Sequence, residues 1–152
     1  MEIPLRLVRA DLETGSTAAA RTRLSTLDEV IPGDWRLSWL RGQAALLDAD
    51  FAGAAAEFET VLATLPGELA PKLALAAVAE LRGNHRDMAL RYYDNVWRTD
   101  HGYVSAAFGL ARQRAANGDR PGAIAALDQV PAASAYFTEA GATAVEILLE
   151  GR

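Results

Sequence analysis

Four residues near the middle of the sequence have the types and the spacing of a calcium-binding loop. Asp48, Asp50, Gly53 and Glu59 occupy positions 1, 3, 6 and 12 of an EF-hand template, in which oxygen atoms surround Ca²⁺. Positions 5 and 9 of that template are alanines here, and an alanine side chain offers no oxygen. A turn between two helices, with aspartates that cap the second helix, accounts for the same four residues. We therefore predict no metal site.

The rest of the sequence lacks the patterns of known catalytic and metal sites. His85 and His101 are the only histidines, and neither has a second ligand at helical spacing, which argues against zinc. The absence of cysteine removes thiolate ligands, a thiol nucleophile and disulfides. Glycine-rich phosphate loops, kinase triplets and the G-x-S-x-G elbow are missing as well. We predict a chain that is not an enzyme and uses no cofactor.

Charge and hydropathy exclude two classes of partner. The formal net charge of -5 does not attract phosphate backbones, so we expect no nucleic acid. The longest apolar stretch, residues 69–81, is interrupted by polar residues and by proline, and it is shorter than the roughly 20 residues that span a bilayer. We expect no membrane insertion, and the lack of cysteine fits a cytoplasmic protein.

The elements that must position any functional side chain recur at a fixed interval. Pairs of helix-packing residues follow one another at a step of 34 positions, and the last pair comes one residue late: Ala20 and Leu24, Ala54 and Phe58, Met88 and Tyr92, then Ala123 and Leu127. Pro32-Gly33 and Pro66-Gly67 keep the same step. A period of 34 residues is typical of tetratricopeptide repeats, in which each unit is a pair of helices, A and B.

The period predicts an all-α protein, an α-solenoid of about three to four tetratricopeptide-like hairpins followed by a capping helix. We expect one domain over residues 1–152, with repeats at about 3–33, 34–67, 68–101 and 102–131 and a capping helix at about 134–150. Asp34 is the expected N-cap of the second A helix. Trp35 and Trp97 are expected in the core between repeats.

Positions 2, 5, 9 and 12 of each A helix face the concave surface of such a stack. Counting these positions gives a candidate protein-binding face composed of Arg36, Trp39, Gln43, Leu73, Glu80, Phe108 and Arg112. Tryptophan and arginine are frequent hot-spot residues at protein interfaces. The alternative is that Trp39 and Phe108 pack against neighbouring A helices.

Several segments are more specific than the general repeat pattern: GDWRL at 33–37, LPGELAPKLALA at 65–76, VWRTD at 96–100 and YVSAAFGLA at 103–111. Across about residues 30–131 the chain resembles the C-terminal tetratricopeptide domain of actinobacterial serine/threonine protein kinase G. The resemblance implies a domain associated with dimerisation and with recruiting or selecting the substrates of a soluble kinase. The kinase lobes and the cysteine-rich metal module of that family are missing from this sequence, so no catalytic or metal-binding residue carries over.

These observations support two hypotheses from different classes. In the first, the chain is a non-catalytic regulatory domain in kinase signal transduction that binds a protein substrate or regulator, or a second copy of itself in a homodimer. In the second, it is a structural segment that orients or restrains a kinase domain in cis, or a stand-alone adaptor. The sequence is compatible with an excised domain or with a separate short gene product.

Overall fold

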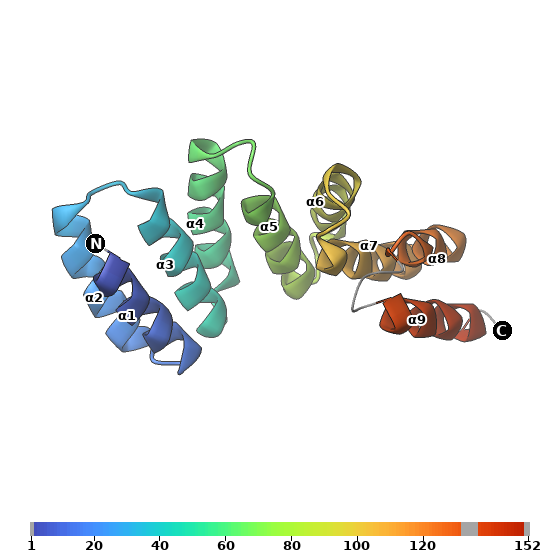
Figure 1. Cartoon of the computed structure of the whole chain (residues 1–152), viewed down its shortest axis with the longest axis horizontal. Helices are drawn as coiled ribbons and strands as arrows, with labels where there is room; N and C mark the ends of the chain where they lie inside the picture. The colour runs from blue at the N-terminus through green and yellow to red at the C-terminus, as the bar shows by residue number, and fades with distance from the viewer. Residues whose placement is uncertain (1, 132–136, 151–152) are drawn as a thin grey trace. The chain divides into compact units, whose positions relative to one another are not determined.

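The computed structural model describes residues 2–131 and 137–150, and within these ranges it contains helices and no strand (Figure 1). In chain order the helices are α1 (Glu2–Glu13), α2 (Thr17–Val30), α3 (Trp35–Leu47), α4 (Phe51–Thr64), α5 (Leu69–Arg82), α6 (Arg86–Thr99), α7 (Val104–Ala116), α8 (Arg120–Asp128) and α9 (Phe137–Glu150). The all-α repeat prediction is confirmed. The predicted capping helix coincides with α9, although its first residues, 134–136, lie outside the described residues. None of the described helices has the length and apolarity to cross a bilayer.

Each A helix ends in the same kind of turn, which needs one residue in the left-handed backbone region. That residue has a φ of 77°, 58°, 79° and 82° in the four hairpins, at Gly15, Ala49, Gly83 and Gly118. In three of the turns the next amide donates a hydrogen bond to the carbonyl five residues earlier, which closes a Schellman motif: Ser16 to Asp11, Asp50 to Ala45 and Asp119 to Arg114. The second hairpin makes this turn with alanine instead of glycine.

The third hairpin contains one extra turn residue, which corrects the predicted register. In the other hairpins the N-cap of the B helix directly follows the left-handed residue, whereas here Asn84 stands between Gly83 and the N-cap, His85. The buried pair is therefore Ala89 and Tyr93, with Ala89 fully buried and Tyr93 3% exposed. The prediction of Met88 and Tyr92 was wrong, since both are only partly buried. The fourth pair comes late because the extra residue lies upstream of it.

At the positions where the calcium template places metal ligands, Asp50 caps a helix and Asp48 accepts hydrogen bonds from side chains of α2. The Asp50 carboxylate accepts a hydrogen bond from the Gly53 amide at 3.0 Å, which caps α4. A Cβ on Gly53 would overlap the Asp50 carboxylate, so the cap in this form requires glycine at this position. Asp48 accepts hydrogen bonds from Thr17 at 2.8 Å and from Arg21 at 3.2 Å. The capping interpretation is confirmed for Asp50.

Cα packing divides the chain into two compact units, Met1–Val78 and Ala79–Arg152. In the first unit α1 packs on α2, α3 packs on α4, and both α1 and α2 contact α3. The core consists of apolar residues from all of these helices, among them Leu5, Val8, Leu24, Leu37 and Leu40. The Phe58 ring lies directly on Gly42, where a Cβ would overlap the ring. This contact holds α3 and α4 close together.

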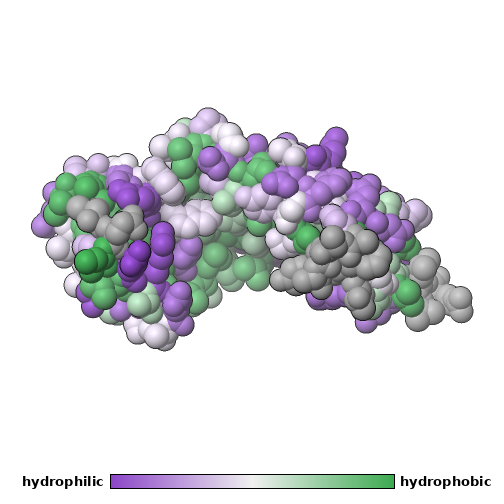
Figure 2. All heavy atoms as spheres, in the orientation of Figure 1, coloured by the Kyte–Doolittle hydropathy of each residue, from purple (hydrophilic) through white to green (hydrophobic). Residues whose placement is uncertain are grey.

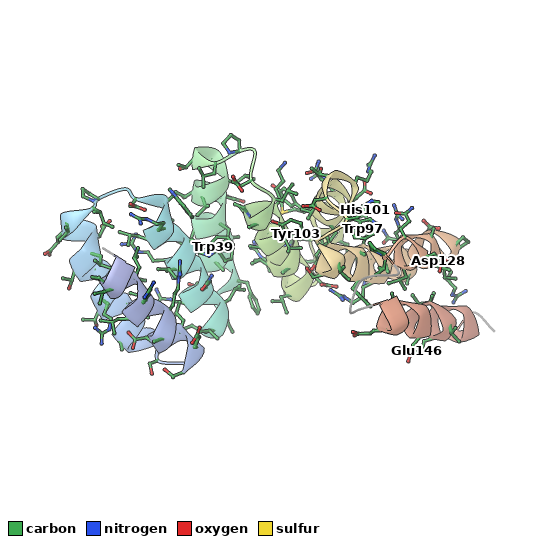
Figure 3. All side chains as sticks on the ribbon, viewed as in Figure 1. Trp39, Trp97, His101, Tyr103, Asp128 and Glu146 are labelled. Carbon is green, nitrogen blue, oxygen red and sulfur yellow. The ribbon has the colours of Figure 1, made fainter. Side chains whose placement is uncertain are left out.

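In the second unit α6 packs on α7, α7 packs on α8, and α8 packs on α9. The Tyr93 ring lies on Gly109 of α7 in the same way as Phe58 lies on Gly42. Trp97 is 1% exposed, donates a hydrogen bond to Gln129 at 3.0 Å and stacks on His101 at 4.3 Å between ring centroids (Figure 3). The prediction that Trp97 fills the core is confirmed.

Candidate protein-binding site

The first unit contains an open hollow of about 510 Å³ that two tryptophans line. Its lining comes from α1, α3 and α4 and from the start of α5: Leu5, Arg9, Trp35, Arg36, Trp39, Leu40, Val61, Leu65, Glu68, Ala70 and Pro71. Trp35 and Trp39 are four residues apart on α3 and so lie on one face of that helix. We call this cavity the tryptophan hollow.

Trp35 and Trp39 differ in how they are held. Trp35 is 38% exposed, so the prediction that it fills the core was wrong. It is the first residue of α3, where no preceding helical turn covers it. Trp39 is partly buried, and its ring packs on Phe58 with 5.2 Å between centroids and 56° between planes (Figure 3). The Trp39 side chain therefore both packs on Phe58 and lines the hollow.

Arg36 is held at the hollow by Asp34. Its Nε and Nη2 donate hydrogen bonds to the two carboxylate oxygens at 3.0 and 2.8 Å. Asp34 also accepts from the Arg36 amide at 2.9 Å, which confirms the predicted N-cap of α3. The side-chain hydrogen bond from Arg36 lowers the pKa of Asp34 below its usual value. The guanidinium orientation is thus tied to the first turn of the helix.

Arg9 connects the tryptophan hollow to a second one. The second hollow has a volume of about 390 Å³ and is lined by Arg9, Leu12, Glu13, Gln43, Leu46 and Leu47. The two hollows share Arg9, and both are lined by residues of α1 and α3, so we call them together the groove between α1 and α3. The Arg9 side chain is exposed, and no carboxylate of the described residues is in ion-pair distance of it. Of the predicted residues, Gln43 belongs to this second hollow.

In the second unit the predicted residues Glu80 and Arg112 form an ion pair. Arg112 donates from Nε and Nη2 to the two Glu80 oxygens at 2.8 and 2.9 Å. Glu80 also accepts from the Tyr93 hydroxyl at 2.8 Å and from Gln113 Nε2 at 3.0 Å. These hydrogen bonds, led by that of Arg112, lower the pKa of Glu80 in spite of its partial burial. Burial and the adjacent Glu80 carboxylate raise the pKa of Tyr93.

Gln113 was missed by the sequence reasoning, and nothing in the local pattern identifies it. It is 6% exposed and is the buried polar side chain of this cluster.

Phe108 and Arg112 line a separate hollow of about 450 Å³ in this unit, together with residues 102–105 and Glu139. Leu73 is partly buried and lines none of the hollows described above. The structure therefore groups Arg36 with Trp39 in the tryptophan hollow, with Gln43 in the adjoining hollow, and it groups Arg112 with Glu80 and Phe108 in the second unit. Leu73 belongs to neither group.

Comparison with known proteins identifies the repeat type and the family. A solved structure of a thermophilic TPR protein from Thermus thermophilus has the same fold, with a TM-score of 0.74 and 20% sequence identity over 98% of this chain and 81% of that one. The chain is 49% identical to the serine/threonine-protein kinase PknG of Mycobacterium leprae (strain TN) and 47% identical to that of Mycolicibacterium smegmatis (strain ATCC 700084 / mc(2)155). All of this chain is covered in both, but only 20% of each kinase. The family model described as protein kinase G tetratricopeptide repeat matches residues 1–152, so the chain belongs to that family.

Proposed function

We propose that this chain is the non-catalytic recruiting domain of a PknG-type serine/threonine kinase and binds the kinase's protein substrates. The observation that carries the proposal is the tryptophan hollow, which presents Trp35 and Trp39 beside an oriented arginine. Tryptophan and arginine are the residue types that dominate binding energy at protein interfaces. The described residues contain no group of three or more metal-ligating side chains that could hold an ion.

Recruitment works here through effective concentration. A substrate segment held in the groove would keep the acceptor residue near a kinase active site in the same polypeptide, without any chemistry in the repeat domain. Such a domain lowers the apparent KM for a protein substrate. It leaves the turnover of a short generic peptide unchanged. Such a peptide is too short to bind in the groove while it also occupies the kinase active site.

The test replaces the corresponding segment of the M. smegmatis kinase by this chain and compares the chimera with its Trp35→Ala variant. We expect the KM for a protein substrate to rise roughly tenfold or more, the factor typical of a hot-spot residue, with kcat and generic-peptide turnover unchanged. Leu81→Ala, which removes an exposed apolar side chain of the second unit, is the matched control. An unchanged KM in the Trp35 variant refutes recruitment through this hollow. A change in generic-peptide turnover assigns the domain to restraint of the kinase in cis.

Self-association is a second candidate function, favoured by an apolar strip on α1. Ile3 is 72% exposed and Leu7 is 44% exposed, and they lie one helical turn apart. Figure 2 shows apolar atoms among hydrophilic ones over the end of the unit that α1 and α2 form. If this strip joins two copies, light scattering should show a dimer that Ile3→Lys converts to a monomer. A monomer in the unmodified chain excludes it.

A further inference from the structure

The charged side chains of the groove are divided between its two hollows. Glu68 lines only the tryptophan hollow, Arg9 lines both hollows, and Glu13 lines only the second one. One guanidinium therefore belongs to both hollows, while each hollow has one carboxylate of its own and the tryptophan hollow has the two indoles. Arg36 does not add a separate positive charge to this series, because its guanidinium is bound to Asp34.

From this distribution of charges we infer that the groove takes an extended substrate segment that carries an apolar side chain and, two residues further along, a single carboxylate. The inference rests on the proposed recruiting function and specifies its ligand. The apolar side chain fills the hollow against Trp35 and Trp39, and the carboxylate pairs with Arg9. Because Arg9 is exposed and has no carboxylate partner among the described residues, it does not have to break an existing ion pair to bind the ligand.

The spacing follows from helix and strand geometry. Leu5 lines the tryptophan hollow and Arg9 lies one turn further along α1, a rise of about 6 Å. Two residues of an extended chain span about 7 Å and point their side chains to the same face. An apolar residue, a spacer and an acidic residue therefore match the rise from Leu5 to Arg9 along α1.

The flanking carboxylates limit the ligand to one negative charge. Glu13 in the second hollow and Glu68 in the tryptophan hollow would each repel a second carboxylate on the ligand. The net charge of -5 adds to that repulsion over a longer range. A run of acidic residues is thus a poorer ligand than an isolated one.

The test uses three acetylated and amidated hexapeptides with the central sequences Phe-Ala-Glu, Phe-Ala-Gln and Phe-Ala-Lys, titrated into the ¹⁵N-labelled chain. The side-chain indole signals of Trp35 and Trp39 should shift, while that of Trp97, which is buried in the other unit, should not. The glutamate peptide should bind roughly two- to fivefold more tightly than the glutamine peptide, which is the factor expected of an exposed ion pair. The lysine peptide should bind most weakly.

The decisive variant is Arg9→Glu, which should reverse the order so that the lysine peptide binds best. Arg6→Glu is the matched control, because Arg6 is exposed on the same helix and lines neither hollow. Equal affinities for the three peptides, or the same reversal in both variants, overturn the inference. If the Trp35→Ala chimera raises KM while the peptides show no charge preference, the recruiting function stands and the ligand assignment is wrong. If neither effect is seen, both proposals fail.

Discussion

Ala49→Gly should stabilise the protein, because Ala49 holds a backbone conformation that suits glycine. Its φ of 58° is the one left-handed value found at a non-glycine position among the described residues. The left-handed region costs an L-residue roughly 1–2 kcal/mol, and glycine loses about 0.5–1 kcal/mol more conformational entropy than alanine on folding. The net expected gain is about 0.5–1 kcal/mol.

Local contacts do not offset that gain. The Ala49 side chain is exposed, so little apolar burial is lost with its methyl group. The turn is held by backbone hydrogen bonds, from the Ala49 amide to Leu46 at 3.0 Å and from the Asp50 amide to Ala45 at 2.8 Å. Glycine keeps both bonds.

The assay is urea unfolding followed by circular dichroism, with thermal melting as a second measure. At this chain length 1 kcal/mol corresponds to a Tm shift of about 2–4 °C. Ala56→Gly is the matched control: Ala56 is exposed inside α4, where glycine should destabilise by about 1 kcal/mol. The denaturant m-value must stay constant for the comparison to hold. A loss of stability in both variants would refute a left-handed Ala49.

Three further predictions concern packing, charge and capping. Phe58→Ala should destabilise by about 3–5 kcal/mol, measured by urea unfolding, because it empties the space over Gly42; a near-normal melting curve would contradict that contact. Glu80→Gln should cost about 1–3 kcal/mol at pH 7, because charge-assisted hydrogen bonds from Arg112 are lost. Since the pKa of Glu80 is lowered in the fold, its contribution is complete above the ordinary value of 4.5 and is lost as pH falls through the folded pKa, so the unmodified protein should lose more stability than the variant on acidification. His85→Asp should stabilise α6 by about 0.5–1 kcal/mol, because His85 is an N-cap without a side-chain hydrogen bond; unchanged unfolding would show that aspartate does not cap there.

Local signals predicted the helices well because each depends on residues close together in sequence. The expected helices are observed within the described residues, and Asp34 caps α3 as predicted. Glycines two residues beyond the last helical positions, such as Gly15 and Gly118, adopt the left-handed turns that end the helices. Such features follow from backbone conformation and from contacts within one or two helical turns.

The candidate site was predicted less completely, because its parts come from residues about 30 positions apart. Glu80 and Arg112 were predicted in the protein-binding face, but only the structure shows that their side chains pair across 32 residues of sequence. The buried Gln113 beside them has no sequence signal. Trp35 and Trp97 were both predicted in the core, yet one lines an open hollow and the other is buried. Exposure of this kind depends on which neighbouring helix covers a side chain.

From the chain alone one could derive helical hairpins, their approximate period and the family, because periodicity and turn chemistry are local properties. The three-dimensional structure decided which face of each helix is buried and which charges meet. The reason is visible at Asn84: a single added residue turns the following helix by about 100° relative to the expected register, since a helical turn holds 3.6 residues. That rotation replaces Met88 and Tyr92 by Ala89 and Tyr93 in the core, and it brings the Tyr93 hydroxyl to Glu80.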